Sequence, residues 1–331
     1  MKQKIIKDIK ENLWFIISLL FVLIIFYVEL PYLVYTPGDI SDVNNRIVYD
    51  FKKEFKGSFN MASVKGLKSN IFFIGLANII PSWDAVKADR VKLENETINQ
   101  MNNRDRLMLI EGNNNALTVA LDEAKISYEK TNIVHEITYL TNESKTNLQV
   151  GDQIILVDNQ KIDNLSSLIE HINTLEVGDK VNILVKRNDQ EKNLTAEVYL
   201  FKERKMIGVM LSTLFDLKLD FKLELKTENR ESGGSGGLMT ALAVYNNLTQ
   251  KDLTNGRKIV GTGTIDAAGN VGLIGGVKYK LIGAVKNNAD LFIVPKNNLK
   301  EALEYKKKYN YKIEIIGVNT FKEAVELLNV S

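Results

Sequence analysis

Hydrophobic and polar positions follow a different pattern in each part of the chain, and the first part is apolar on every side. Residues 13–28 contain Ser18 as the only polar side chain apart from an amphipathic tyrosine, and after Glu29 the apolar character continues to Tyr35. About 20 such residues are enough for a helix to cross roughly 30 Å of hydrocarbon. A buried core helix is the alternative, but such helices are rarely apolar on every face. The pattern predicts a transmembrane helix over 13–35.

The charges around this segment predict its orientation. Only Arg46 lies within about 15 residues after it, whereas four lysines precede it: Lys2, Lys4, Lys7 and Lys10. Cytoplasmic flanks of membrane helices carry the excess of basic residues. A cleaved signal peptide would need a small-x-small cleavage site, and none follows. We therefore expect an uncleaved single-pass anchor, with residues 1–12 in the cytoplasm and everything after Tyr35 outside.

Short periodic segments follow the apolar stretch as far as residue 124. Residues 46–56 and 58–64 have the pattern of two strands joined at Lys56-Gly57. Residues 84–110 are charged with helical spacing, and 116–124 predict an amphipathic helix. The run Asn113-Asn114-Asn115 predicts a loop between these two helices.

Residues 125–203 predict a compact β-rich module. Strands are expected over 133–140, 152–157, 181–185 and 194–200, and apolar side chains recur at helical spacing over 165–175. The run Leu148-Gln149-Val150-Gly151-Asp152-Gln153-Ile154-Ile155-Leu156-Val157-Asp158 resembles the L-x-x-G-D-x-I-x-x-V-(D/N)-G motif of PDZ domains.

The PDZ resemblance implies a groove in which an extended peptide adds as a further strand. We expect this groove between strand 133–140 and helix 165–176. A glycine-rich carboxylate-binding loop is not recognisable before Ile133. His171, on the helix, either faces the groove or is a packed or surface histidine.

The last part of the chain, 205–331, predicts a mixed α/β domain. Residues 217–226 alternate between apolar and charged side chains, as in a half-buried strand. A glycine-rich turn follows, and then further elements: helix 238–248, strand 258–265, a turn at 268–270, helix 277–287, strand 291–294, helix 298–308, strand 312–316 and a helix from Phe321.

Composition narrows the chemistry that this chain can perform. It is 45% hydrophobic and 25% charged, which is typical of globular proteins. The 43 basic and 41 acidic residues nearly cancel, so the protein has no overall field for a nucleic acid, and we expect no such partner. Cysteine is absent, and His135 and His171 are the only histidines. We therefore expect no metal and no cofactor, and chemistry that uses hydroxyl, amine, carboxylate or backbone groups.

The turn from Ser232 to Gly237 is the first candidate for that chemistry. Gly-Gly-Ser-Gly-Gly also occurs in flexible linkers, and that alternative stays open on composition alone. However, a turn between a strand and a helix places Ser235 where backbone N–H groups converge with the positive end of the helix. The N–H groups around Gly234, Ser235 and Gly236 are thus candidate donors to an oxyanion.

A nucleophilic serine needs a base, and both histidines lie in the other module. A lysine can serve if burial in an apolar pocket lowers its pKa. Lys278 and Lys280 both begin the helix that follows the glycine-rich run 271–277. Helical spacing gives each of them apolar neighbours, so spacing does not decide between them.

Two motifs resemble those of Lon-type serine-lysine proteases. Residues 232–239, Ser-Gly-Gly-Ser-Gly-Gly-Leu-Met, resemble the nucleophile motif G-G-P-S-A-G-L-M. Residues 261–265 and 269–277 resemble the second motif, which ends G-G-(L/V/I)-x-x-K with the catalytic lysine. The resemblance implies that Ser235 is the nucleophile and Lys280 the base, and that Thr262 matches a threonine that holds the lysine. It places Lys278 at a variable position.

The chain also departs from these motifs. Ser232, Gly234 and Gly236 replace a glycine, the proline and the alanine of the nucleophile motif, which makes the turn less rigid. Thr264 stands where ATP-dependent Lon enzymes have an acidic residue. No G-x-x-x-x-G-K-[ST] motif occurs, so we expect no nucleotide as a partner.

An anchor, a PDZ domain and a Lon-type domain together are similar to the membrane-anchored, PDZ-containing Lon-like proteases of low-GC Gram-positive bacteria. Residues 57–61 and 113–116 also resemble the N-terminal region of that subfamily. The expected fold class is α+β, in five parts: a cytoplasmic basic N-terminus (1–12), a transmembrane anchor (13–35), an N-terminal α/β region associated with the protease domain (36–124), a PDZ-like domain (125–203) and a Lon proteolytic-type mixed α/β domain (204–331).

The resemblance implies a membrane-anchored, ATP-independent endopeptidase that acts outside the cytoplasm. Its expected partners are the membrane and an extended peptide or protein substrate, such as a secreted peptide or a flexible segment of a surface protein. The alternative function is a catalytically inactive, anchored PDZ adaptor with a protease-like domain, because a fold resemblance alone does not establish activity.

Overall fold

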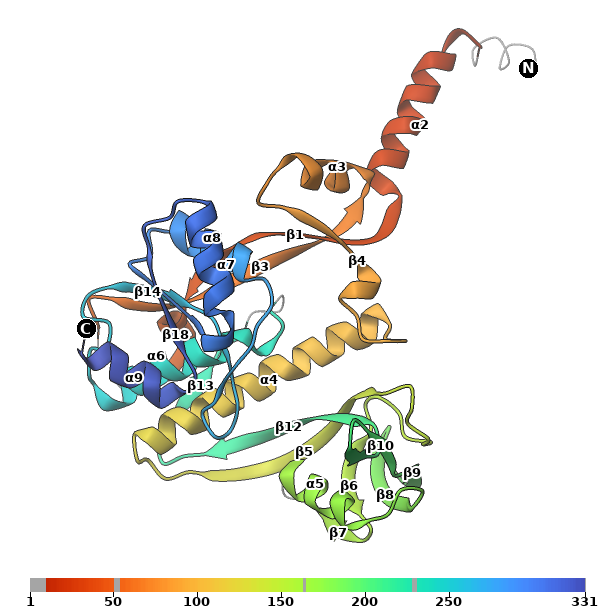
Figure 1. The fold of residues 1–331 in the computed structure, drawn as a ribbon, viewed down its shortest axis with the longest axis vertical. Coiled ribbons are helices and arrows are strands. Elements are labelled where there is room, and N and C mark those ends of the chain that lie inside the picture. Colours follow the sequence, from red (N-terminus) through yellow and green to blue (C-terminus); the bar gives the residue numbers. More distant parts are fainter. Residues whose placement is uncertain (1–9, 51–53, 163–164, 228–230, 331) are drawn as a thin grey trace.

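Two six-stranded sheets with a long helix between them form most of the protein (Figure 1). The structure is a computed structural model, and it describes residues 10–50, 54–162, 165–227 and 231–330. The first sheet has the strand order β18-β17-β14-β3-β1-β4, and the second has the order β12-β5-β6-β8-β9 with β7 paired to β6. The strands of the first sheet are β1 (Glu29–Asp42), β3 (Ser58–Asn70), β4 (Asp84–Lys87), β14 (Lys258–Gly261), β17 (Leu291–Pro295) and β18 (Glu314–Val318).

Helices cover both faces of the first sheet where its strands run parallel. Side chains of β17 alternate between two cores, because Ile293 packs on the side of α6 and Phe292 packs on the side of α7. Strands buried on both faces are typical of parallel sheets between helices. One face is covered by α6 (Gly237–Thr249) and α9 (Phe321–Val330), and the other by α7 (Val277–Lys286) and α8 (Leu299–Lys308). The helices and strands predicted after residue 237 are confirmed with slightly shifted ends, except that β15 (Thr264–Ile265) is separate from β14 and pairs with β16 (Val271–Gly272).

The N-terminal helix is shorter than the sequence predicts. Helix α2 covers Leu13–Tyr27, and β1 begins at Glu29. The expectation of one helix through Tyr35 is wrong, because the stretch before Tyr35 contains Pro31 and is paired with β3 on one side and β4 on the other. Within the part of the chain that the structure describes, no helix combines the length and the apolar character needed to span a membrane.

Strands β1 and β3 form a long antiparallel ribbon. Its tip pairs Glu29 with Asn70, and its base pairs Asp42 with Asn60, where β3 also joins β14. Helix α3 (Ile71–Ile79) follows β3 at the tip, and β4 returns along β1. The strand predicted over 58–64 is therefore the base of a longer one. Among the described residues of 46–56, only β2 (Ile47–Tyr49) is a strand, and it pairs with β13 (Leu223–Leu225).

Helix α4 (Ile98–Glu123) runs without a break through the asparagines at 113–115, so the loop predicted there is wrong. Thr97 and Gln100 form a capping box at its start. Asparagine is a poor helix former, but Asn114 Nδ2 donates to the carbonyl of Phe215 at 2.6 Å and Asn115 Nδ2 donates to that of Ile265 at 3.2 Å. These side chains bond to neighbouring strands, which the local sequence cannot show.

The second sheet includes a strand that lies beyond the predicted module. Its elements are β5 (Glu129–Leu140), β6 (Gln153–Val157), β7 (Gln160–Lys161), α5 (Leu165–Thr174), β8 (Lys180–Arg187), β9 (Gln190–Glu197) and β12 (Val209–Lys218), with the hairpin of β10 (Tyr199–Phe201) and β11 (Arg204–Met206) beside it. Because β12 pairs with β5 along most of its length, the sheet continues to residue 218 rather than ending at 203. The single strand predicted over 217–226 is thereby divided between β12 and β13.

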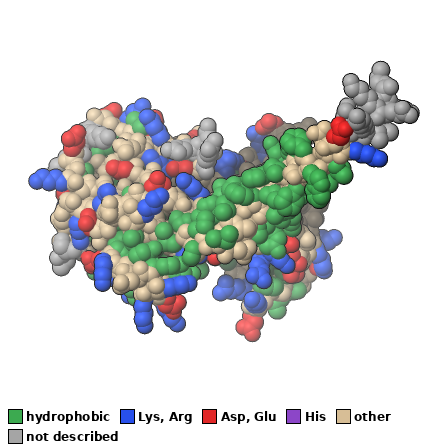
Figure 2. Space-filling view, turned by 90° about the horizontal axis from the view of Figure 1, so that it is seen from above, with side chains coloured by type: hydrophobic (Ala, Val, Ile, Leu, Met, Phe, Trp, Pro, Cys, Tyr) green, Lys and Arg blue, Asp and Glu red, His purple; other side chains and the backbone are tan. Residues whose placement is uncertain are grey.

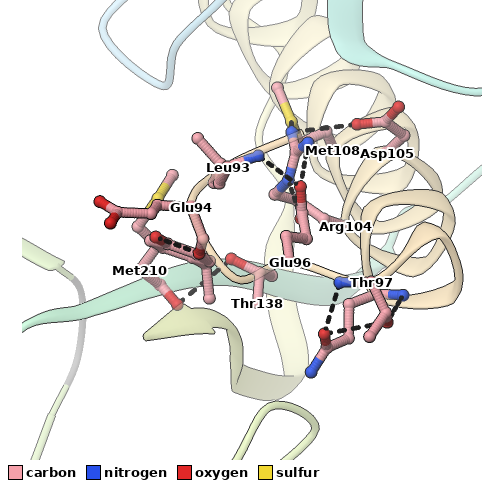
Figure 3. Close-up of polar contacts among 11 residues, drawn as sticks. Leu93, Glu94, Glu96, Thr97, Arg104, Asp105, Met108, Thr138 and Met210 are labelled. Atoms are coloured by element: carbon pink, nitrogen blue, oxygen red, sulfur yellow. Dashed lines mark hydrogen bonds and ion pairs between the residues drawn. The ribbon is translucent and has the colours of Figure 1, made fainter. Parts of the chain in front are cut away.

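Polar contacts at the start of α4 join it to the second sheet (Figure 3). The carboxylate of Glu96, which is buried, accepts from Leu93 N at 2.9 Å and pairs with Arg104 at 2.7 Å. The hydroxyl of Tyr139, on β5, donates to the carbonyl of Glu94 at 3.0 Å. The contact from Tyr139 holds the loop before α4 against β5, and the Glu96–Arg104 pair holds that loop to the helix.

Candidate active site

Ser235 and Lys280 meet in space although 45 residues separate them. Ser235 lies in the single turn η3 (Gly234–Gly236), and Lys280 lies near the start of α7. The Nζ atom of Lys280 is 2.9 Å from Ser235 Oγ and 2.9 Å from Thr262 Oγ1, and it donates to both. The structure thus brings the serine, the lysine and the threonine named from the sequence into one hydrogen-bonded cluster.

The lysine side chain is buried, as a base at neutral pH requires. Lys280 is only 4% exposed, and the buried residues of its own helix include Val277, Leu281 and Ala284. Burial disfavours the charged ammonium form and lowers the pKa of Lys280 to about 8. A substantial fraction of the amine is therefore neutral near physiological pH and can accept a proton.

The turn that carries Ser235 is an ordered element, and not the flexible linker that its composition allows. The carbonyl of Ser235 accepts from Gly263 N at 2.7 Å and from Thr262 Oγ1 at 3.0 Å. Gly233 N donates to the carbonyl of Asp105 in α4 at 2.8 Å. Helix α6 begins directly after η3, so its positive end lies at the serine.

Two close approaches explain glycines around the nucleophile. A Cβ atom at Gly236 would lie 2.4 Å from the sulfur of Met61, so Met61 fills the space of the alanine methyl in the Lon-type motif. A Cβ atom at Gly112, in α4, would lie 3.2 Å from the Cα of Gly234. Gly236 thus lies against β3, and Gly234 lies against α4.

The sequence did not identify Met61, Gly112 or Arg46 as neighbours of the site. Arg46 donates to the carbonyl of Lys226 at 3.0 Å and pairs with Glu231 at 2.6 Å, and so holds both ends of the segment that leads to η3. The only sequence signal was that 57–61 and 113–116 resemble a family's N-terminal region. Met61 ends the first stretch, and Gly112 precedes the second.

Lys278 lies outside the cluster, although spacing alone did not separate it from Lys280. Its Nζ atom pairs with Asp84 Oδ2 at 2.6 Å, and the hydroxyl of Tyr279 donates to the same oxygen at 2.6 Å. Lys278 thus ties α7 to β4. Ser232 is exposed and precedes η3.

Both histidines bond within the second sheet and its connections. His171 Nε2 lies 2.8 Å from Asp158 Oδ2, so its ring binds the turn after β6. His135 Nδ1 lies 3.0 Å from Thr213 Oγ1. In the described ranges, no three residues of the histidine, cysteine, aspartate and glutamate types are grouped as a metal site would need.

The position predicted for the peptide groove is wrong. Strand β5 is paired with β12 as far as Leu140 and with β6 at His135 and Glu136, so it is an inner strand of the sheet and not an edge. Strand β12, on the outer side of β5, is one edge of the sheet, and β9 is the other. Helix α4 binds part of this edge, because the backbone N–H of Thr213 donates to Glu111 at 3.1 Å. Only the first residues of β12, near Met210, lie before that contact.

Comparison with known families finds a different family in each of two regions of the chain. Residues 228–330 match the family model of the Lon protease (S16) C-terminal proteolytic domain, and residues 123–198 match that of the PDZ domain. The C-terminal region is a Lon-type proteolytic domain. Together with the buried lysine beside a serine, this identifies it as a serine peptidase domain.

Curated relatives support the same conclusion for that region. The Lon protease of Mesomycoplasma hyopneumoniae is 32% identical over 98 residues, which cover 30% of this chain and 11% of the relative. Lon protease 2 of Borreliella burgdorferi is 23% identical over 232 residues, which cover 67% of this chain and 28% of the relative. The chain thus spans only a small part of the length of these relatives.

Among solved structures, the PDZ domain of an SdrC-like protein from Listeria monocytogenes is similar to part of this chain. It shares 23% identity, covers 24% of this chain and 85% of its own, and has a TM-score of 0.21. The assignment of the PDZ domain therefore rests on the family match.

Proposed function

We propose that the protein is a membrane-anchored, ATP-independent endopeptidase that acts outside the cytoplasm on secreted peptides or flexible segments of surface proteins. The observation that carries the proposal is the 2.9 Å contact between the Nζ atom of Lys280, whose pKa is near 8, and the Oγ atom of Ser235. A neutral amine within hydrogen-bond reach of a hydroxyl is the arrangement that activates a serine without histidine.

In the proposed reaction, Lys280 Nζ takes the proton of Ser235 Oγ while that oxygen forms a bond to the peptide carbonyl carbon. The resulting oxyanion is stabilised by backbone N–H groups around Gly234, Ser235 and Gly236, at the positive end of α6. As the peptide C–N bond breaks, Lys280 returns the proton to the leaving amine. Water, deprotonated by the same amine, then hydrolyses the ester on Ser235. Thr262 Oγ1 orients Nζ, 2.9 Å away, throughout.

Features of α2 and of the N-terminal sequence support the anchoring part. No residue of α2 is buried, and Trp14 and Phe15 are 82% and 69% exposed, which is unfavourable in water. Four lysines precede or begin this segment, which favours a cytoplasmic N-terminus and an external catalytic domain. The lack of a Walker-type phosphate loop in the sequence supports ATP independence and a substrate that is already extended.

The PDZ domain is proposed to bind part of the substrate at the start of β12. An extended peptide can add to this edge before the contact with Glu111. Helix α5, which contacts β11, offers an apolar face, since Leu165 and Ile169 are 46% and 51% exposed, while Leu168 and Ile172 are buried on the other face. Lys205, in β11, donates to the carbonyl of Leu175 just beyond α5, and so ties the C-terminal end of α5 to β11.

The decisive experiment measures peptides released from a cell-surface extract by the full chain in vesicles. We expect Ser235→Ala, Lys280→Ala and Lys280→Arg to abolish release, because a guanidinium stays protonated and cannot act as a base. The matched control Lys278→Ala should retain most of the activity. For the wild type, kcat/KM should rise as pH increases through about 8, as the Lys280 amine loses its proton.

Two outcomes would overturn the proposal. Turnover by Lys280→Arg close to that of the wild type would contradict the dyad. Retention of peptides by the wild type without any cleavage would favour the inactive PDZ adaptor instead.

A further inference from the structure

The tip of the β1–β3 ribbon joins two apolar helices. Helix α2 ends shortly before Glu29, the first residue of β1, and α3 begins directly after Asn70, the last residue of β3. Glu29 and Asn70 pair with each other, so both helices leave the ribbon at the same point. The amide Nδ2 of Asn70 donates to the carbonyl of Phe26 at 2.7 Å, and the rings of Phe26 and Phe72 are 4.8 Å apart. The position of α3 relative to α2 is therefore fixed.

Helix α3 exposes apolar side chains that nothing in the described chain covers fully. Its sequence is Ile-Phe-Phe-Ile-Gly-Leu-Ala-Asn-Ile, without a charged residue, and none of its residues is buried. Ile79 is 76% exposed, Ile71 42% and Phe72 39%. A helix at the surface of a globular protein normally places polar residues on its outer face. Figure 2 shows that apolar side chains gather in a band that begins at the N-terminal helix.

The two tryptophans of the chain lie beside these helices. Trp14 is near the start of α2, and Trp83 follows α3 in a turn in which its N–H donates to the carbonyl of Ile80 at 3.0 Å. Tryptophan is enriched at the two membrane–water interfaces, where its ring meets the headgroups. Asp84 follows and pairs with Lys278, so the polar surface of the protein resumes there.

The length of α2 also bears on α3. Its 15 residues rise about 22 Å, less than the roughly 30 Å of bilayer hydrocarbon. A short membrane helix draws its flanking residues toward the bilayer or thins it locally. Because α3 contacts the end of α2, it is the flanking element on the catalytic side.

We infer that α3 is a second membrane contact, which lies in the lipid–water interface of the outer leaflet beside the end of α2. The inference rests on the proposed anchoring by α2. The lipid bilayer is the occupant that fits, because the apolar surface of α3 continues that of α2 and a tryptophan flanks each helix. Contact at two helices would hold the ribbon, and with it the catalytic domain, at one orientation to the membrane.

Single-tryptophan variants of the full chain in phosphatidylglycerol–phosphatidylcholine vesicles test the inference. One variant keeps Trp14 alone as the probe of α2. The others replace both native tryptophans by phenylalanine and add Ile79→Trp on α3 or Lys300→Trp on the exposed face of α8. Lipids brominated on the acyl chain quench only tryptophans in contact with them. We expect roughly twofold or stronger quenching at residues 14 and 79 and none at 300.

A charge on α3 provides the matched comparison. In the variant that keeps Trp83 alone, Ile79→Glu should reduce quenching by brominated lipid. Ile98→Glu, at an equally apolar and 43% exposed position at the start of α4, should leave it unchanged. Both variants should cleave a short soluble peptide at the wild-type rate, which shows that they are folded.

The outcomes separate this inference from the proposed anchoring. Quenching at residue 14 without quenching at residue 79, with residue 79 open to aqueous acrylamide, would overturn the role of α3 and leave the anchor intact. A residue 79 shielded from both lipid and acrylamide would mean that a protein partner or a second copy covers α3, which also overturns it. Lack of quenching at both residues would contradict the anchor as well.

Discussion

Burial of the Lys280 amine affects stability as well as chemistry. Its pKa falls from about 10.5 in the unfolded chain to about 8 in the folded protein, because burial disfavours the charged form. Below pH 8 both states bind the proton, and holding the buried charge costs on the order of 3 kcal/mol. Between about pH 8 and 10.5 the unfolded chain binds more protons than the folded one. The free energy of unfolding therefore rises with pH in this window.

Lys280→Met removes this dependence. The variant lacks the two hydrogen bonds of Lys280 Nζ at every pH, which lowers its stability by a constant amount. The test is therefore how the difference in unfolding free energy between wild type and variant changes with pH. We expect the stability of the wild type relative to Lys280→Met to increase by roughly 3 kcal/mol between pH 8 and 10.5. Denaturant unfolding at a series of pH values measures it. The control is Lys278→Met, which loses the ion pair with Asp84 but keeps the buried amine, so its change in stability with pH should match that of the wild type. Parallel curves for wild type and Lys280→Met would mean that the amine is not buried as described.

The Met61 side chain occupies the space that a side chain at position 236 would need. An alanine at 236 would place its Cβ 2.4 Å from the sulfur of Met61. That sulfur is also contacted by Arg46 at 3.4 Å and by Thr240 at 3.7 Å, so it is not free to move. We expect Gly236→Ala to lower kcat roughly tenfold through displacement of η3. Met61→Ala should restore much of it in the double variant, and equal losses in both backgrounds would contradict this coupling.

At the scale of elements, α4 links the two functional parts. Its residue Glu111 binds the edge of β12, and its residues Asp105 and Gly112 contact the turn that carries Ser235. Burial raises the pKa of Glu111, while the bond from the Thr213 N–H opposes that shift. A peptide added to β12 would thus end beside a helix that supports the nucleophile.

The apolar face of α5 gives a test of the PDZ domain as a substrate site. Ile169→Asp places a charge on this exposed face without disturbing the buried Leu168 and Ile172. We expect KM for a protein substrate to rise about tenfold, while kcat for a short peptide stays unchanged, because the proposed binding face and the dyad lie in separate domains. Glu170→Ala, one residue further on the helix, is the control. Unchanged KM for Ile169→Asp would remove this face from substrate binding.

Elements whose partners are local in sequence could be predicted, and those defined by distant pairing could not. The helices and strands after residue 237 follow from periodicity, and the motifs placed Ser235 and Lys280 together. The continuity of α4 could not be predicted, since Asn114 and Asn115 are satisfied by strands more than 100 residues away. The groove was misplaced because only the pairing of β5 with β12 shows which strand is the edge.

At the scale of the whole molecule, the ribbon connects α2, the proposed membrane anchor, to the active site. Figure 1 shows α2 at one end and the PDZ sheet at the other, with the catalytic domain between them. Val64, which pairs with Pro37, lies against Gly276 at the start of the helix that carries Lys280. From Glu29 to Pro37 a strand advances about 26 Å. Pro37, and the start of α7 beside it, can therefore lie at most about 26 Å from the end of α2.

With the proposed anchoring by α2, this distance sets a spacing requirement for substrates anchored in the same membrane. An extended chain covers about 3.3 Å per residue, so about eight residues suffice to reach the dyad from the bilayer surface. In vesicles that contain the full chain and substrates with flexible spacers of increasing length, cleavage should rise with spacer length and level off by about eight residues. The same substrates in detergent micelles, where both proteins diffuse freely, should show no such dependence. Equal cleavage of a substrate without a spacer would place the dyad at the membrane surface, and a rise that continues well beyond eight residues would require a ribbon longer than the register from Glu29 to Pro37 permits.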